Sequence, residues 1–315
     1  MKFRNKILIT GGAGYIGSSI ADFLVKKNYN ITVIDKLEYK NFPFNHLIKY
    51  KNFKFIYGNI LDNKFFNQKL IKKFDIIIPL AALVGAPLCE KKKKLATETN
   101  LKSVEYLTKK MSKSQKIIFA TSNSGYGIGE KGKYCDETSP LRPVSHYGVT
   151  KMKAEKFVVS FKNSVSFRLA TVFGYSFRMR SDLLVNNFVE LSMRKKNIKL
   201  YESNFRRNFI HIQDVCRAIE FSIKNFSKMR GQIYNLGLST ANLTKKQLAL
   251  KIKKKLPYLK ISYIKNISDP DKRDYFVSNK KIEKLGYMPI YSLENGIDEL
   301  IEFFKYNNKN FINNY

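Results

Sequence analysis

The chain has 315 residues, of which 44% are hydrophobic, a length and composition that predict a globular protein of one or two domains and exclude a disordered one. Lysine and arginine number 58 against 25 acidic residues, which gives a net charge of +33. The basic residues are spread along the chain without the pattern of an RNA- or DNA-binding module. We therefore expect a solvated basic surface that attracts anionic substrates, and no nucleic-acid partner.

Other composition signals point away from membranes, metals and disulfides. The longest apolar run, residues 76–88, contains two prolines and is too short to cross a bilayer. The five residues before the first apolar strand are polar overall, and we expect no secretory leader. The three cysteines are an odd number without metal-ligand spacing, and the three histidines stand far apart. We expect a cytoplasmic protein with no membrane partner and no metal.

The first forty residues carry a dinucleotide-binding pattern. A strand at Lys6–Thr10 runs into a G-x-G-x-x-G sequence at Gly12–Gly17, a helix follows, and a second strand at Ile31–Ile34 ends in Asp35. The glycines permit a tight turn and close approach to a pyrophosphate, which the N–H groups of the helix N-terminus attract. Asp35 can accept hydrogen bonds from the adenosine ribose, so a ligand-free glycine turn is the weaker alternative. Lys36 could attract a 2′-phosphate that Asp35 would repel, and we expect NAD rather than NADP.

Strands and helices alternate through the first half of the chain, and several strands are apolar without alternation. This pattern predicts an α/β fold with a Rossmann-type doubly wound parallel sheet. We expect an NAD-binding domain at residues 1–174 and a smaller C-terminal α/β lobe, mainly for the substrate, at residues 175–315. The predicted strands are Lys6–Thr10, Ile31–Ile34, Lys54–Tyr57, Ile76–Leu80, Lys116–Thr121 and Ser164–Leu169, and the predicted helices include Thr97–Met111, Tyr147–Val159, Leu183–Lys195, Val215–Asn225, Lys245–Lys254 and Leu293–Tyr306.

A Y-x-x-x-K pair follows the fifth strand. Tyr147 and Lys151 are four residues apart, so on a helix they share one face. An ammonium group near a phenol favours the phenolate and lowers the pKa of the tyrosine, which makes it a usable general base. The pair alone is a weak signal, but Ser122 at a strand end and the glycine loop strengthen it.

These motifs resemble the extended short-chain dehydrogenase/reductase family of nucleotide-sugar epimerases and dehydratases over nearly the whole chain. The family's T-G-G-x-G-x-x-G is Thr10–Gly17, and its Y-x-x-x-K is Tyr147–Lys151. Its R-x-x-x-V-Y/F-G is Arg168–Gly174, and its R-D-[YF]-[IV]-H-V-x-D is Arg207–Asp214. The resemblance implies catalysis by Ser122, Tyr147 and Lys151, NAD contacts from Gly11, Gly14, Tyr15, Ile16, Gly17, Asp35, Lys36, Asn59, Ile60, Leu80, Ala81 and Ala82, substrate contacts at Asn123, Ser124, Arg207 and Arg273, and a homodimer.

One departure from the family pattern bears on the reaction. Sugar 4,6-dehydratases carry Asp-Glu after the catalytic Ser or Thr, whereas this chain has Asn123 and Ser124, so dehydration is not expected. Residues 79–88, 123–131, 167–174 and 269–275 resemble the GDP-heptose 4-dehydrogenase branch of bacterial capsule pathways. That likeness implies NAD-dependent oxidation at C4 of a GDP- or UDP-linked sugar.

Rival interpretations remain open. A nucleotide-sugar 4-epimerase similar to UDP-glucose 4-epimerase would use the same three catalytic residues. Arg207 could instead form a structural ion pair with Asp214, and Arg273 could pair with Asp271 or Asp274. A non-catalytic NAD-binding protein with an RNA-binding surface has only the net charge in its favour.

Overall fold

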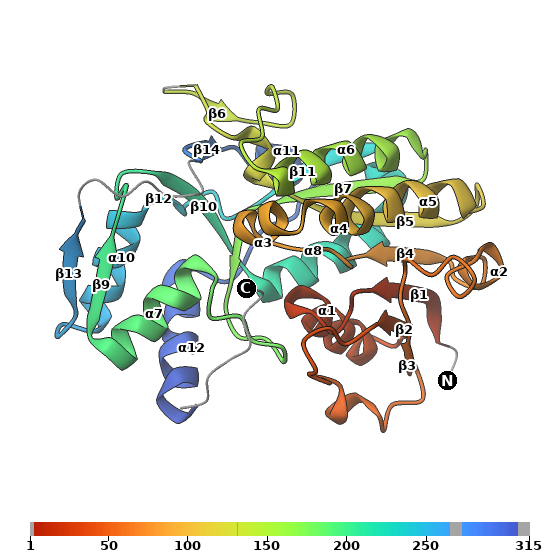
Figure 1. Ribbon diagram of the computed structural model, residues 1–315, viewed down its shortest axis with the longest axis horizontal. Coiled ribbons are helices and arrows are strands. Elements are labelled where there is room, and N and C mark those ends of the chain that lie inside the picture. The colour runs from red at the N-terminus through yellow and green to blue at the C-terminus, as the bar shows by residue number, and fades with distance from the viewer. Residues whose placement is uncertain (1–2, 131, 265–272, 308–315) are drawn as a thin grey trace.

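The computed structural model describes residues 3–130, 132–264 and 273–307 of the chain. Its centre is a seven-stranded sheet in the order β11-β7-β5-β4-β1-β2-β3, in which every neighbouring pair is parallel (Figure 1). The strand order reverses direction at β1, which is the switch point where ligands bind in such sheets. The strands are β1 (Arg4–Thr10), β2 (Tyr29–Asp35), β3 (Phe53–Tyr57), β4 (Ile76–Pro79), β5 (Lys116–Ser122), β7 (Ser164–Leu169) and β11 (Gln232–Leu236).

Successive residues of a strand point to opposite faces of the sheet, and in the central strands both sets are apolar. Helices therefore cover both faces. Ile7 and Ile9 of β1 are buried in one hydrophobic cluster with α1 (Tyr15–Lys26) and α8 (Ile212–Lys224). Leu8, between them, is buried in a second cluster with α5 (Ser103–Lys110) and α6 (His146–Ser160). The doubly wound parallel sheet predicted from the sequence is confirmed.

A smaller lobe lies beside the sheet, at the left of Figure 1. It contains a three-stranded sheet in the order β12-β10-β8 and a parallel pair, β13-β9, and its helix α12 packs against α7. Its elements are β8 (Thr171–Phe173), α7 (Leu184–Lys195), β9 (Asn197–Leu200), β10 (Arg206–His211), β12 (Asn242–Thr244), α10 (Lys245–Lys255), β13 (Lys260–Tyr263) and α12 (Leu293–Tyr306).

Elements that follow residue 174 also return to the central sheet, β11 and α8 among them. β11 pairs with β7, and α8 packs against α1. The domain boundary at residue 174 stays a prediction. β11 and α8, although they follow it in the sequence, pack with the predicted NAD-binding domain.

The predicted helix at Thr97–Met111 is wrong in one respect, because it is interrupted. The structure has α4 (Lys93–Thr97), then a π-helical segment, η2 (Glu98–Lys102), and then α5. The buried amide of Asn100 in η2 bonds Leu83 through both the backbone carbonyl, at 2.9 Å, and the backbone N–H, at 2.8 Å. A π-bulge of this kind often marks a functional region. The remaining elements are η1 (Asn45–Leu47), α2 (Gln68–Ile71), α3 (Ala86–Lys91), η3 (Asn123–Tyr126), β6 (Tyr134–Cys135), α9 (Phe226–Met229), β14 (Phe276–Val277) and α11 (Lys280–Glu283).

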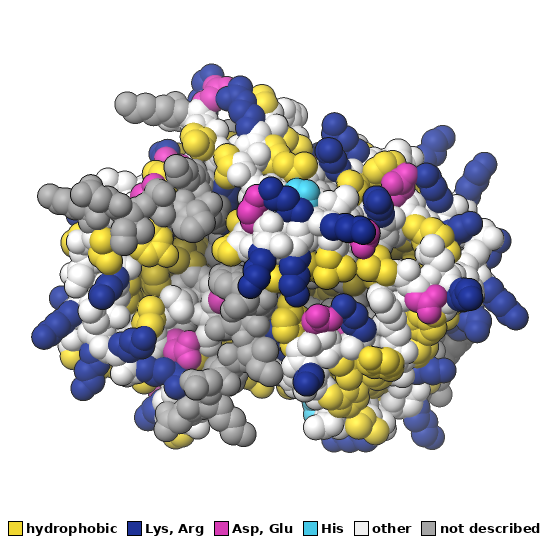
Figure 2. All heavy atoms as spheres, in the orientation of Figure 1, with side chains coloured by type: hydrophobic (Ala, Val, Ile, Leu, Met, Phe, Trp, Pro, Cys, Tyr) yellow, Lys and Arg dark blue, Asp and Glu magenta, His cyan; other side chains and the backbone are white. Residues whose placement is uncertain are grey.

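The basic side chains are dispersed over the visible surface, as expected from their spread along the sequence (Figure 2). Lysine and arginine side chains are scattered over the visible face in Figure 2 rather than gathered in one patch. Within the described residues, no helix is long and apolar enough to cross a membrane. In the same part of the chain no group of three or more His, Cys, Asp or Glu side chains could hold a metal, and the three cysteines are buried free thiols.

Candidate active site

A cavity of about 1220 Å³ brings together nearly all of the residues selected from the sequence. It begins at the carboxyl ends of the central strands and extends to residues of the smaller lobe. Asn123 is the only predicted site residue outside the cavity lining. It is buried, and it lies in the sequence between two lining residues, Ser122 and Ser124. The lining includes Gly11, Gly14, Tyr15, Ile16, Gly17, Asp35, Lys36, Asn59, Ile60, Leu80, Ala81, Ala82, Ser122, Ser124, Tyr147, Lys151, Arg207 and Arg273.

The glycine loop has the backbone geometry that its sequence requires. Gly11 has a φ of +68°, and a Cβ there would lie 2.4 Å from the backbone of Ala81, so only glycine fits. Gly14 precedes the first residue of α1 and faces open space, since a Cβ would come near only the Gly11 carbonyl, at 3.2 Å. The helix N-terminus therefore opens on the cavity, which suits the binding of a pyrophosphate.

Asp35 lies at the end of β2, and its carboxylate already supports the loop. Its two oxygens accept hydrogen bonds from the backbone N–H of Ala13, at 3.0 Å, and of Leu37, at 2.8 Å. Burial raises the pKa of Asp35 above its ordinary value, while these N–H donors and the charge of Lys36 oppose the shift. Lys36 itself forms an ion pair with Glu38 at 2.5 Å, which reduces its attraction for a 2′-phosphate.

Tyr147 lies in the first turn of α6, where the helix dipole favours a phenolate. The helix begins at His146 because the Ser145 side chain caps it, accepting a hydrogen bond from the Gly148 N–H at 3.2 Å. Within the described residues the Tyr147 hydroxyl makes no hydrogen bond, so it is available to a ligand. The expected lowering of its pKa is wrong for this ligand-free state: burial raises the pKa of Tyr147 to about 12, and the charges of Arg273 and Arg180 only partly oppose this.

Lys151 follows Tyr147 by one helical turn and is 5% exposed. Its ammonium lies 4.2 Å from the centre of the Phe119 ring. Burial lowers the pKa of Lys151 to about 8, although Glu155, one turn further on, raises it. A buried ammonium at the cavity wall is suited to binding ribose hydroxyls and to stabilising a neighbouring phenolate.

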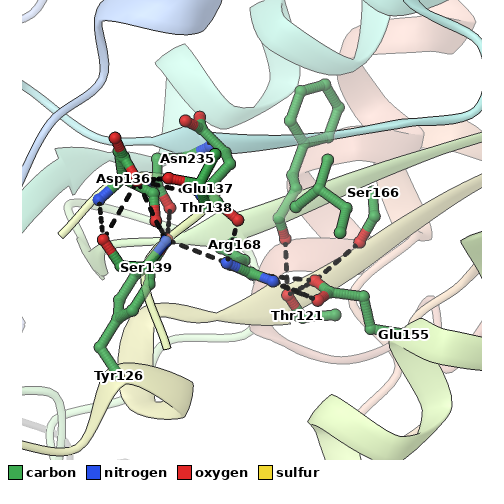
Figure 3. Close-up of polar contacts among 12 residues, drawn as sticks. Thr121, Tyr126, Asp136, Glu137, Thr138, Ser139, Glu155, Ser166, Arg168 and Asn235 are labelled. Carbon is green, nitrogen blue, oxygen red and sulfur yellow. Dashed lines mark hydrogen bonds and ion pairs between the residues drawn. The ribbon is translucent and has the colours of Figure 1, made fainter. Parts of the chain in front are cut away.

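Glu155, one helical turn after Lys151 on α6, is held by a buried polar network (Figure 3). Arg168 pairs with Glu155, with its Nη2 atom 2.8 Å from Oε1, and also donates to the hydroxyl of Tyr126 at 3.1 Å. Thr121 and Ser166 donate to the same carboxylate at 3.0 and 3.2 Å. The Arg168 motif of the sequence thus supports the helix that carries Tyr147 and Lys151, the predicted catalytic residues.

Ser122 ends β5, and its two successors, Asn123 and Ser124, begin the short helix η3. The Ser122 hydroxyl accepts a hydrogen bond from the Ser124 N–H at 3.1 Å, so it caps the short helix η3 as well as lining the cavity. The amide of Asn123 and the hydroxyl of Ser124 are buried without a hydrogen-bond partner. Neither side chain is an acid or a base near neutral pH.

The two arginines expected to bind a diphosphate both line the cavity. Arg207, on β10, donates to the backbone carbonyls of Arg206, at 2.9 Å, and of Arg273. The two described acids among the proposed alternative partners pair with other residues. Asp214 pairs with Arg217 at 2.6 Å, Asp274 pairs with Arg206 at 2.7 Å, and Asp271 lies outside the described residues.

Sequence reasoning missed two contributors. Asn100 ties the cavity segment at Leu83 to Thr150 of α6, whose hydroxyl lies 3.3 Å from its amide nitrogen. The signal was a polar amide in the middle of a predicted helix. Arg178 lines the cavity from the β8–α7 loop, and its sequence gives no signal beyond a basic residue in an irregular segment.

Comparison with known proteins now identifies the family. The model of the NAD dependent epimerase/dehydratase family matches residues 7–237. The chain belongs to this family. It is therefore an NAD-dependent enzyme of the oxidoreductase and isomerase kind that acts on nucleotide sugars, and the predicted cofactor, NAD, is confirmed.

Individual relatives of this family member carry two kinds of name. The dTDP-D-glucose 4,6-dehydratase of Dictyostelium discoideum is 29% identical, covering 98% of this chain and 83% of that protein. The human enzyme of the same name is 28% identical, covering 99% and 93%. The structure of UDP-glucose 4-epimerase from Thermotoga maritima with UDP-glucose has a TM-score of 0.82 and 25% identity, covering 95% and 98%.

The residues present fit NAD. The open helix N-terminus at Gly14 would hold the diphosphate, Asp35 the adenosine ribose, and Lys151 the nicotinamide ribose. When bound, NAD supplies a hydride acceptor. The arrangement can then remove the proton of one sugar hydroxyl and a hydride from the carbon that carries it.

Proposed function

We propose that this enzyme oxidises C4 of a nucleotide-linked sugar, a GDP-heptose-like substrate, in bacterial surface polysaccharide synthesis. The observation that carries the proposal is the meeting of Ser122, Tyr147 and Lys151 with the glycine loop around one cavity. Tyr147 accepts the proton of the C4 hydroxyl, a carbonyl forms at C4, and the C4 hydrogen leaves as hydride, which reduces NAD to NADH. Ser122 donates a hydrogen bond to the reacting oxygen.

The charges of the cavity support a diphosphate-linked substrate. Arg207 and Arg273 contribute guanidinium groups, which bind phosphate oxygens in pairs. Binding of the remote nucleotide then helps to place C4 against the cofactor. The GDP-heptose assignment rests on the sequence segments that resemble that branch. A homodimer and a cytoplasmic location stay predictions.

A 4-epimerase is the second candidate, because the same three residues serve both reactions and a 25% identical relative is named UDP-glucose 4-epimerase. In that case the 4-keto sugar turns over and takes the hydride back on its other face. The dehydratase names of other relatives favour a third outcome, loss of water. Against it, Asn123 and Ser124 offer no acid or base at the strand end.

The deciding experiment incubates the purified protein and NAD with GDP- and UDP-linked sugars and analyses the products by mass spectrometry. Loss of two hydrogens together with formation of NADH is the expected result. An isomer of unchanged mass would replace this proposal with epimerisation, and loss of water would replace it with dehydration. Absence of conversion of every sugar tested would overturn it.

A further inference from the structure

Arg178 is a buried arginine on the loop between β8 and α7. It is 2% exposed, it lines the cavity, and its guanidinium carbon lies 4.2 Å from the centre of the Tyr39 ring. Two hydrogen bonds fix this loop against the start of α1. The Ser176 hydroxyl donates to the Tyr15 carbonyl at 2.6 Å, and the Tyr15 hydroxyl donates to the Gly174 carbonyl at 2.7 Å. Arg178 is therefore carried by a loop that is bonded to the helix at which the glycine loop ends.

The charge of Arg178 is only partly offset by the protein, through the more distant carboxylates of Asp182 and Asp35. Within the described residues it has no ion pair, and its Nη2 atom is buried without a hydrogen-bond partner. Burial, and then the positive charge of Arg180, lowers the pKa of Arg178 from its ordinary value. Arg180 differs, because it pairs with Asp182.

An unpaired buried cation is unfavourable, and an anionic ligand would remove the cost. Asp35 attracts Arg178, but both carboxylate oxygens of Asp35 already accept backbone N–H groups. Tyr39 and Asp35, the neighbours of Arg178, thus lie at the end of the cavity near the carboxyl end of β2. Arg207, by contrast, lies on β10 and belongs to the part expected to bind the substrate.

We propose that Arg178 binds a phosphate of the NAD diphosphate, adding a side chain from the β8–α7 loop to the backbone site at α1. The planar guanidinium can donate to phosphate oxygens in pairs, whereas the helix N-terminus supplies N–H groups and a partial charge. This inference goes beyond the proposed sugar oxidation. It depends only on NAD binding, so either proposal can fail without the other.

The test measures NAD binding by calorimetry to the wild-type protein, R178Q, R178K and R230Q. Arg230 is exposed and outside the cavity, so R230Q matches the lost charge without touching the site. We expect R178Q to bind NAD about 10- to 100-fold more weakly, as for the loss of hydrogen bonds to a charged group. R178K should fall between, because it keeps the charge without the planar fork, and R230Q should match the wild type.

Two further ligands locate the contact. Adenosine, which has no phosphate, should bind the wild-type protein and R178Q equally, whereas ADP-ribose should show the loss seen with NAD. Equal NAD affinity of R178Q and the wild type would overturn the proposal. So would a loss confined to NADP, which would assign Arg178 to a 2′-phosphate, or a loss confined to GDP or UDP, which would assign it to the substrate.

A thermal melt separates ligand binding from a folding defect. Without NAD, R178Q should unfold at the wild-type temperature or above, because the substitution removes an unpaired buried charge. Saturating NAD should then raise its unfolding temperature less than it raises that of the wild-type protein. A marked destabilisation of R178Q without NAD, together with an unchanged NAD affinity of R178K, would show a structural role and refute the inference.

Discussion

Arg168 and Arg178 are two buried arginines with opposite surroundings. Arg168 pairs with Glu155 and donates to the Tyr126 hydroxyl, and it lies within a network of hydrogen-bonded side chains (Figure 3). Arg178 lies against the face of the Tyr39 ring, and within the described residues its Nη2 atom has no hydrogen-bond partner. Buried polar groups are normally satisfied, so the contrast separates a scaffold network from a residue suited to binding a ligand.

Hydroxyl groups at the end of β5 show the same contrast. The Thr121 side chain donates to Glu155, and on β7 the Ser166 side chain does the same. Ser124, three residues after Thr121, has a buried hydroxyl without a partner and lines the cavity. The boundary between scaffold and site therefore falls within one short segment, and substitutions on its two sides should behave differently.

Tyr147→Phe should have the largest effect, because it removes the proton acceptor while keeping the ring. We expect turnover to fall by about 10³-fold, since general acid–base catalysis contributes roughly 10²- to 10⁴-fold. NAD affinity, measured by calorimetry, should stay unchanged. Turnover within tenfold of the wild type would exclude Tyr147 as the base.

Arg168→Met should have the largest effect on stability. It leaves Glu155 buried without its ion pair, a change that costs about 3–5 kcal/mol of unfolding free energy in comparable cases. The matched variant Arg178→Met removes a charge that forms no ion pair within the described residues, and should cost less than about 1 kcal/mol in the absence of NAD. Urea unfolding of both ligand-free proteins measures the difference, and equal losses would contradict the contrast.

Most of the fold could be predicted from the sequence because its signals are local. The strand at Ser164–Leu169 and the helix at Leu293–Tyr306 have the predicted bounds, since apolar runs and a Ser cap define them. The break in the helix around Asn100 could not be predicted. It depends on bonds from its amide to Leu83 and Thr150, which are distant in sequence.

The site was predictable where a motif carries the chemistry. The glycine loop and the Tyr147–Lys151 pair have fixed spacings, and the cavity contains both. Arg178 was not predictable, because its importance comes from burial and from a guanidinium nitrogen that has no hydrogen-bond partner within the described residues. The direction of the Tyr147 pKa shift was also missed, since spacing reveals Lys151 but not the degree of burial.

Lys151→Met should stabilise the ligand-free protein while abolishing activity. The pKa of Lys151 is about 8 in the folded state and about 10.4 in an unfolded chain, so at neutral pH its charge opposes folding by on the order of 1–3 kcal/mol. Between these pKa values the unfolded state binds more protons, and wild-type stability rises with pH. The advantage of the variant in urea unfolding should therefore shrink from pH 7 to pH 10. An advantage that is constant or grows would refute this account of Lys151.

Ser124→Ala should have the smallest effect on stability. It compares a buried hydroxyl that has no partner with one that is hydrogen-bonded. Its hydroxyl has no partner, so removing it should leave the unfolding free energy unchanged or raise it by up to about 1 kcal/mol. The matched variant Ser166→Ala loses a hydrogen bond to Glu155 and should cost about 1 kcal/mol or more. If Ser124 contacts the sugar nucleotide, its variant should also raise KM several-fold, which Ser166→Ala should not do. Equal destabilisation by the two variants would show that Ser124 belongs to the scaffold after all.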